Sequence, residues 1–294
     1  MQLSCRIEGI RLKKILLGTI FFASVLFANS TTLSYSHSKK DFENSMTKKD
    51  DAKVKNINIS HKVSNHLISL GYQSDNVNRQ HSITNAILPS LDIEKYNAKY
   101  IYSLNKNLKL KANYVKIIDN LAPTDQGKIY GLGAKYNLSK GLNIALDFYR
   151  SDYDKFNVNQ YDLSLSKGFK FDKLKVKTTI IAKKIDIDGN KYGGYTFVDK
   201  DYFITGLKLG ANYNSYYAGV GAFFGKRIFS ILDDGTKVQH HAMEQDKTYM
   251  LKLGKKFKDF DFNVKYSFQN GKELPENRDD VDTKVVSFNI NYTF

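Results

Sequence analysis

The sequence predicts an all-β protein, an antiparallel transmembrane β-barrel that follows a cleaved signal peptide. Three observations lead to this fold class. A short apolar run follows an N-terminal basic cluster, apolar and polar residues alternate along most of the chain, and connections are alternately short and long. The composition agrees, because 20 Tyr and 19 Phe with only 3 Pro suit strands far better than a helical bundle.

Residues 1–28 have the order of a secretory signal peptide. Four basic residues lie between positions 6 and 14, an uncharged apolar run covers 15–27, and small residues follow. The run has thirteen residues, whereas a membrane-spanning helix needs about 20, which argues against an N-terminal anchor. Cleavage after Ala28 and cleavage after Ser30 both fit the pattern and remain open.

The remainder of the chain, 29–294, is expected to form one domain. The only cysteine, Cys5, lies in the predicted signal peptide, so the mature chain has no thiol for a disulfide. Removal of the four basic residues and Glu8 lowers the net charge from +15 to +12. Such a basic chain would normally suggest nucleic acid as a partner. Export, however, takes the protein away from nucleic acid. The sequence also contains no nucleic-acid-binding, metal-binding or cofactor-binding signature.

Period-two alternation is clearest at the C-terminus. Successive side chains of a strand face opposite sides, so each such segment has one apolar and one polar face. On one side of the last segment lie Val286, Phe288, Ile290, Tyr292 and Phe294, and on the other Ser287, Asn289, Asn291 and Thr293. Segments around 130–138, 142–148, 249–253 and 260–268 repeat this pattern.

The connections distinguish a membrane barrel from a soluble sandwich. Short links at 64–65, 105–107, 139–141, 170–173, 214–215 and 258–259 alternate with mostly longer ones at 74–91, 119–126, 153–157, 188–200, 229–246 and 270–283. Outer-membrane barrels combine tight periplasmic turns with longer extracellular loops. Twelve strands fit between 68 and 294, and 54–63 adds a thirteenth. A first strand near 31–37 completes fourteen; the alternative has twelve strands, with 29–53 as part of a periplasmic segment.

The terminal run Ser287-Phe288-Asn289-Ile290-Asn291-Tyr292-Thr293-Phe294 resembles the C-terminal signature of Gram-negative outer-membrane β-barrel proteins. The architecture of that class covers roughly 54–294. The resemblance implies a cell-outer-membrane location and recognition of Tyr292 and Phe294 by the barrel-assembly machinery. It identifies no particular porin family.

Assigning faces by parity turns many lysines toward the lumen and leaves few acids there, namely Asp147, Asp162 and Asp261. The predicted pore-lining lysines are Lys95, Lys99, Lys109, Lys111, Lys135, Lys175, Lys177, Lys208, Lys252 and Lys265, with Lys183 and Lys256 on the same faces. Wall charges of one sign enrich the opposite ion in a narrow pore. The alternative explanation is that abundant lysine simply fills polar positions.

Two loops suggest further roles. The range 74–91 is unusually apolar, with Ile83, Ile87 and Leu91, so it either narrows the mouth with Arg79 and His81 or packs over the rim. The range 270–283 is acidic. It either binds divalent cations that bridge lipopolysaccharide or is simply solvated.

These observations predict a porin-like channel for passive diffusion of small solutes, with anion preference. A structural or adhesive barrel without an open pore is the alternative. An enzyme is not expected, because neither Gly-x-Ser-x-Gly nor His-Glu-x-x-His occurs.

Overall fold

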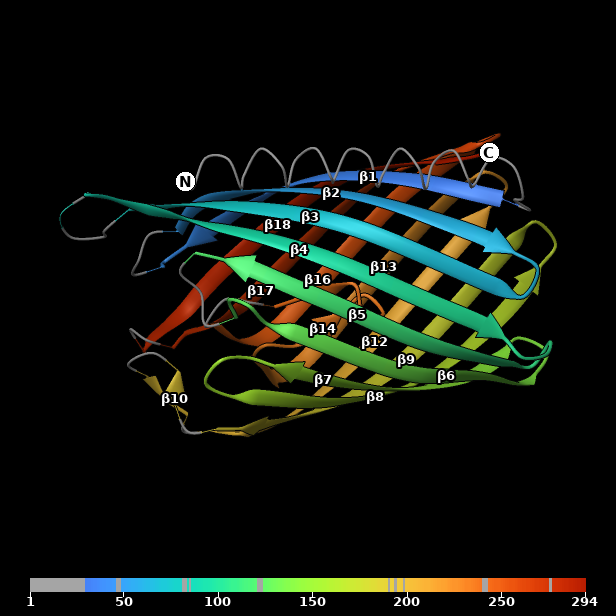
Figure 1. Cartoon of the computed structure of the whole chain (residues 1–294). Helices are drawn as coiled ribbons and strands as arrows, with labels where there is room; N and C mark the ends of the chain where they lie inside the picture. Colours follow the sequence, from blue (N-terminus) through green and yellow to red (C-terminus); the bar gives the residue numbers. More distant parts are fainter. Residues whose placement is uncertain are drawn as a thin grey trace, which may run out of the picture.

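A computed structural model describes residues 30–45, 49–80, 84, 86–120, 124–189, 191–192, 195–197, 199–239, 243–274 and 277–294. Fourteen long antiparallel strands form one closed barrel (Figure 1). The predicted fold class and strand number are confirmed, and the twelve-strand alternative is excluded because β1 and β2 are both part of the wall.

The barrel strands follow one another around the ring in chain order, and β1 closes it by pairing with β18. They are β1 Ser30–Glu43, β2 Lys49–Val63, β3 His66–Gln80, β4 Ile87–Ser103, β5 Leu108–Asp119, β6 Lys128–Ser139, β7 Leu142–Asp152, β8 Asn157–Phe171, β9 Leu174–Asp188, β12 Asp201–Tyr213, β13 Tyr216–Arg227, β16 Met243–Phe257, β17 Phe260–Glu273 and β18 Arg278–Thr293. Two small hairpins lie outside the wall sheet: β10 Lys191–Tyr192 with β11 Tyr195–Thr196, and β14 Ile231–Leu232 with β15 Lys237–Val238.

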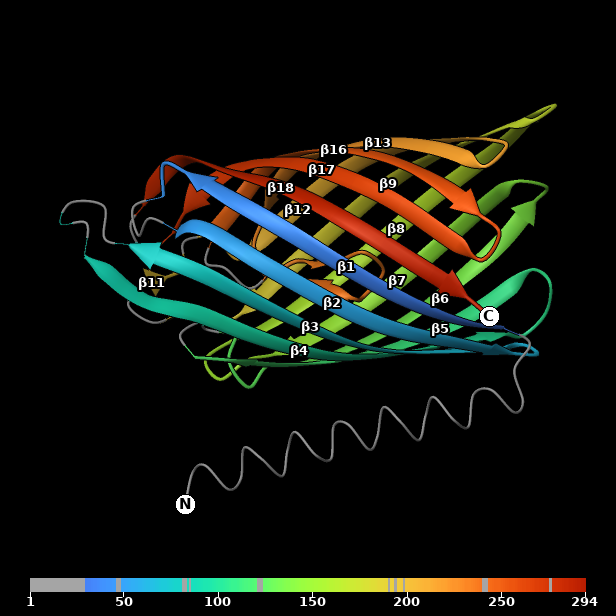
Figure 2. The ribbon, with the colours of Figure 1, turned by 90° about the horizontal axis from the view of Figure 1, so that it is seen from above.

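The alternation of short and long connections is confirmed. Tight turns at 64–65, 140–141, 172–173, 214–215 and 258–259 lie at the end that holds the C-terminus, and the longer connections lie at the other end (Figures 1 and 2). Ser64, Asp172, Asn214 and Lys258 have positive φ angles of 52°, 48°, 53° and 45°. Two-residue hairpins need this conformation, because primed turns match the twist of the strands.

Two predicted loops are wrong in their boundaries. The range expected at 74–91 contains the end of β3 and the start of β4, and the range expected at 270–283 contains the end of β17 and the start of β18. Apolar alternation fades in these stretches, but backbone pairing continues across them, as in the register Asp75 with Ile93 and Asn270 with Asp282. The strands therefore extend beyond the part that the hydrophobic pattern indicates.

The outer face of the wall is apolar. Large exposed hydrophobic side chains occur on most of its strands, for example Leu132 at 65%, Leu146 at 59%, Ile180 at 57% and Leu253 at 55% exposure. Such a band is the surface that outer-membrane barrels present to lipid. Among the described residues, no helix is long and apolar enough to cross a membrane.

Aromatic rings gather at the turn end of β16, β17 and β18. The ring centroids of Phe260 and Tyr292 are 4.7 Å apart, those of Tyr292 and Phe294 5.6 Å, and those of Phe257 and Phe262 6.1 Å. Aromatic girdles mark the membrane–water interfaces of such barrels. The C-terminal signature thus lies in the region that would meet the lipid headgroups.

Candidate functional site

The interior of the barrel holds a cavity of about 580 Å³. Strands from all around the ring contribute polar and charged side chains to it. The lysines that line it are Lys40, Lys95, Lys109, Lys111, Lys135, Lys177, Lys183, Lys208, Lys237 and Lys265. Serine, asparagine and threonine side chains line it as well, together with apolar residues such as Ile101, Ile144, Phe223 and Met250. The lumen is therefore strongly basic, with both polar and apolar surface between the lysines.

One connection folds into this space. It joins β13 to β16, and we call its residues 228–239 the lumen loop. The loop carries the small β14–β15 hairpin, which lies within the outline of the barrel in both views (Figures 1 and 2). Its contacts reach β4, β5, β8, β9 and β17. Because β4 and β5 lie across the ring from β13 and β16, the loop crosses the lumen.

The base of the lumen loop is apolar and fully buried. Ile228 and Phe229 have no exposed surface, and Ile231 has 1%. The Phe229 ring lies 4.7 Å from Phe156 and 6.0 Å from Tyr153 between ring centroids. Burial of such side chains is worth about 1.5–3 kcal/mol each. This packing holds the base of the loop beneath the connection at 153–156.

Gln160 on β8 holds the middle of the loop. Its Oε1 accepts from the backbone amide of Ile231 at 2.7 Å, and its Nε2 donates to the Ile231 carbonyl at 2.8 Å. The Ser230 hydroxyl also donates to Gln160 Oε1, at 3.2 Å. The Gln160 amide therefore pairs with the loop backbone as a neighbouring strand would.

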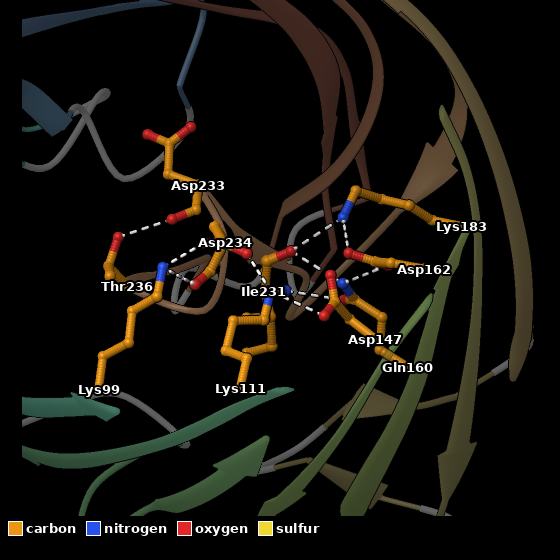
Figure 3. A network of polar contacts seen from close by, with 10 residues as sticks. All are labelled: Lys99, Lys111, Asp147, Gln160, Asp162, Lys183, Ile231, Asp233, Asp234 and Thr236. Atoms are coloured by element: carbon orange, nitrogen blue, oxygen red, sulfur yellow. Dashed lines mark hydrogen bonds and ion pairs between the residues drawn. The ribbon is translucent and has the colours of Figure 1, made fainter. Parts of the chain in front are cut away.

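The tip of the loop is held by ion pairs (Figure 3). Asp234 contacts Lys99 of β4 through one carboxylate oxygen and Lys111 of β5 through the other. Lys111 also pairs with Asp147 of β7 at 2.7 Å. Burial alone would raise the pKa of Asp234, but Lys99 and Lys111 together lower it below its ordinary value. Asp234 is therefore charged at neutral pH.

Two further contacts of charged side chains connect the loop to the wall. Asp233 pairs with Lys237 within the loop at 2.9 Å and approaches Lys265 of β17 at 3.9 Å. Lys237 holds the pKa of Asp233 well below its usual range. On the other side, Lys183 of β9 pairs with Asp162 and donates to the Ile231 carbonyl at 3.3 Å. Near the loop, acids thus neutralise most of the lysines.

Lysines nearer the turn end are arranged differently. Lys109 and Lys135 lie directly opposite each other on β5 and β6, and Lys177 lines the same cavity from β9. We call these three residues the inner lysine cluster. Within the described parts of the chain, none of the three forms an ion pair with a carboxylate. This end of the lumen keeps its positive charge.

The structure places most of the predicted pore-lining lysines at the cavity surface. Lys95, Lys109, Lys111, Lys135, Lys177, Lys208 and Lys265 line it directly. Lys99 contacts the lumen loop, Lys252 lies opposite Lys265, and Lys175 lies two residues from Lys177 on the same face. Their effect on ion selectivity stays a prediction.

Most of the range 74–91, predicted to narrow the mouth or to pack over the rim, belongs to β3 and β4 in the structure. Arg79 lies on β3, paired with Leu88 on β4, because the strands continue past the apolar band; His81 lies outside the described residues. Sequence reasoning missed the lumen loop, although its run Ile228-Phe229-Ser230-Ile231-Leu232 before Asp233-Asp234-Gly235 is a visible signal. An apolar run followed by a turn in a long connection indicates a hairpin with something to pack against.

Across the described residues, no group of three or more His, Asp or Glu side chains is placed to hold a metal ion. No family model matches the sequence, and no curated protein matches it. Solved structures do share its architecture. The fold is that of a Gram-negative outer-membrane β-barrel.

Three of these structures are similar over nearly the whole chain. A bacterial polysaccharide outer membrane secretin has a TM-score of 0.56 at 12% identity, covering 90% of this chain and 98% of its own. The toluene transporter TbuX of Ralstonia pickettii has 0.54 at 9%, covering 92% and 90%. The monoaromatic hydrocarbon channel CymD has 0.54 at 10%, covering 90% and 88%. At these identities the likeness concerns the fold.

Proposed function

We propose that this protein is an outer-membrane channel for the diffusion of small solutes, with a preference for anions. A closed barrel with an apolar outer band and a polar, charged lumen is the architecture of a pore rather than of a packed core. The cavity of about 580 Å³ gives room for small hydrated ions and solutes. The direction of the preference follows from the charges of the wall.

The observation that carries the proposal is the inner lysine cluster. Lys109, Lys135 and Lys177 line the cavity without a carboxylate partner among the described residues, so their charge acts on any ion in the lumen. The Debye length is about 8–10 Å at moderate salt, and an ion in a narrow lumen stays within that distance of the wall. Screening is therefore incomplete, and anions are enriched over cations.

The similar structures suggest other solutes. Two of them are described as a toluene transporter and a monoaromatic hydrocarbon channel. Apolar solutes of that kind favour sites lined mainly by hydrophobic and aromatic side chains. The lumen here carries lysines on strands around the whole ring, which favours anionic solutes instead.

The proposal is tested by the reversal potential of the refolded protein in a planar bilayer under a KCl gradient. Chloride preference is expected, and it should weaken as the salt concentration rises. Replacing Lys109, Lys135 and Lys177 by Glu should move the reversal potential toward cation preference, because three positive wall charges become negative.

The chain offers a matched control. Lys106, Lys140 and Lys173 are exposed residues in the turns at the same end of the barrel. Replacing these three by Glu changes the net charge by the same amount but leaves the lumen wall intact, so the selectivity should stay close to wild type. A cation-preferring wild-type channel, or equal shifts in both triple variants, would refute the lumen as the origin of selectivity.

A structural barrel without an open path is the second candidate, and the lumen loop favours it because it crosses the interior. Deletion of the loop tip, 232–236, distinguishes the two. A channel that the loop only narrows conducts before the deletion and conducts more after it. A barrel closed by the loop conducts only afterwards.

A further inference from the structure

We propose that Lys99 and Lys111 form a carboxylate-binding site on the lumen wall, that Asp234 occupies this site in the structure, and that carboxylate solutes exchange with Asp234 and so release the tip of the lumen loop. The inference rests on the proposed function, since it assumes that solutes reach the lumen. It adds a binding site, a ligand class and a consequence of binding.

The wall alone sets the geometry of the site. Lys99 on β4 lies opposite Asn113 on β5, and Lys111 lies two residues from Asn113 on the same face. The two ammonium groups contact different oxygens of one carboxylate, Asp234 Oδ2 and Oδ1 (Figure 3). Both lysines belong to paired strands, so they keep their places when the loop moves.

Asn113 completes the site with an unused amide. Its side chain is 8% exposed, and neither Nδ2 nor Oδ1 has a hydrogen-bond partner among the described residues. The loop tip covers it, because a Cβ built on Gly235 would lie only 2.7 Å from Asn113 Nδ2. Buried polar groups normally have partners. Withdrawal of the tip would expose this donor beside the two ammonium groups, where a carboxylate oxygen could accept from it.

The charges fit one incoming carboxylate. Lys111 pairs with Asp147 at 2.7 Å, and this partner does not depend on the loop, since both residues belong to the wall. Without Asp234, the two lysines and Asp147 leave one positive charge. Charge-assisted hydrogen bonds from ammonium groups to a carboxylate are stronger than neutral ones, and a carboxylate solute offers the same two oxygens that Asp234 offers.

The occupant is accessible to exchange. The Lys99 and Lys111 side chains are only 13% and 11% exposed, whereas the Asp234 side chain is 51% exposed to the lumen. Asp233 and Asp234 both have positive φ, 47° and 62°, a conformation in which non-glycine residues are uncommon. The tip is therefore an irregular turn that ionic contacts hold in place, not an extension of the wall.

The experiment measures the exposure of the loop tip directly, whether or not the channel conducts. Cys5 is the only cysteine, so Thr236→Cys in a Cys5→Ser background places a single thiol at the tip. Sodium acetate, compared with sodium chloride at equal ionic strength, should increase the rate of maleimide labelling severalfold and saturably. Acetamide, which has the same shape but no charge, should have no effect.

Variants assign the effect to the site. Asp234→Asn should label fast without acetate and respond little to it, because the resident carboxylate is gone. Asp233→Asn removes the same charge one residue away, leaves Lys99 and Lys111 occupied, and should keep the acetate response. Lys99→Gln with Lys111→Gln should label fast and show no response.

The exchange is overturned if acetate does not speed labelling of Thr236→Cys when the site residues are intact. It is also overturned if acetamide speeds labelling as much as acetate does. An acetate response that persists in the Lys99→Gln, Lys111→Gln variant overturns it as well. The reversal potential, measured on the same proteins, separates this inference from the proposed function. An anion-preferring channel without an acetate response rejects the exchange alone, and a cation-preferring channel with the response rejects only the general anion preference.

Discussion

The Thr31 backbone amide donates to the Phe294 carbonyl at 2.8 Å, and the Phe294 amide donates to the Thr31 carbonyl at 2.9 Å. This reciprocal pair is at the turn end of the seam where β1 meets β18. The first and last strands of the barrel are thus joined through the terminal aromatic residue of the C-terminal signature.

Deletion of Phe294 should reduce the amount of folded barrel severalfold. The deletion removes one reciprocal backbone pair at the seam and the ring that packs 5.6 Å from Tyr292. Heat-modifiable migration of protein from outer membranes measures the folded fraction. Phe294→Tyr keeps the backbone and an aromatic ring and should assemble normally. Wild-type amounts of the deletion variant would contradict the role of this residue.

Processing is checked by the intact mass of protein from outer membranes. Loss of 1–28 or 1–30 is expected, because the basic and apolar segments have the order of a signal peptide. A mature species that retains Cys5 would be inconsistent with export through cleavage.

The lipid-facing side of β16 is tested by Leu251→Arg. Leu251 is 44% exposed on the outer face, and a cation there near the membrane midplane costs about 2–4 kcal/mol. Urea unfolding in lipid vesicles should show this loss. Lys252→Glu, one residue along and opposite Lys265 in the lumen, should unfold almost as the wild type does. If Lys252→Glu is strongly destabilised and Leu251→Arg is not, the assignment of the lipid and lumen faces of β16 is inverted.

Gln160→Leu should loosen the lumen loop. The substitution leaves the amide and carbonyl of Ile231 without their side-chain partner, and buried groups left unpaired cost about 1–3 kcal/mol. Thr236→Cys should then label faster with maleimide. Gln160→Glu keeps the acceptor for the Ile231 amide but loses the donor to the Ile231 carbonyl. Its labelling rate should therefore lie between that of Gln160→Leu and that of the protein with Gln160. Equal rates in all three would show that Gln160 does not hold the loop.

The ionic contacts of the loop tip should be lost only in acid. Lys99 and Lys111 lower the pKa of Asp234 although partial desolvation in the lumen opposes this shift, and Lys237 lowers the pKa of Asp233. A lowered pKa stabilises the docked loop above the ordinary carboxylate pKa of about 3.9, and that stabilisation declines as pH falls through the lowered value. Conductance should therefore be constant from pH 7 to pH 5 and change below about pH 4. A change between pH 7 and pH 5 would contradict this.

The sequence by itself determined the wall of the barrel. Alternation in segments such as 260–268 and 286–294 places one residue in two against lipid, and this local pattern is enough to indicate the strands and the order of the hairpins. The choice between twelve and fourteen strands came from the closed wall, which includes β1 and β2. The same rule places Lys109, Lys135 and Lys265 on the lumen face, since successive side chains of a strand point to opposite faces of the sheet. These are properties of neighbouring residues, so a single sequence contains them.

Only the tertiary structure decided what fills the lumen. The docking of 228–239 depends on Gln160, Lys99 and Lys111, which lie far from the loop in sequence and meet it only after the barrel closes. Parity counts lysines on the wall, but it cannot show that Asp233 and Asp234 enter from a connection and neutralise some of them. Nor can it show that the inner lysine cluster has no carboxylate partner among the described residues. Which lysines are paired depends on contacts across the ring, because the fold determines which acidic side chains lie beside each lysine.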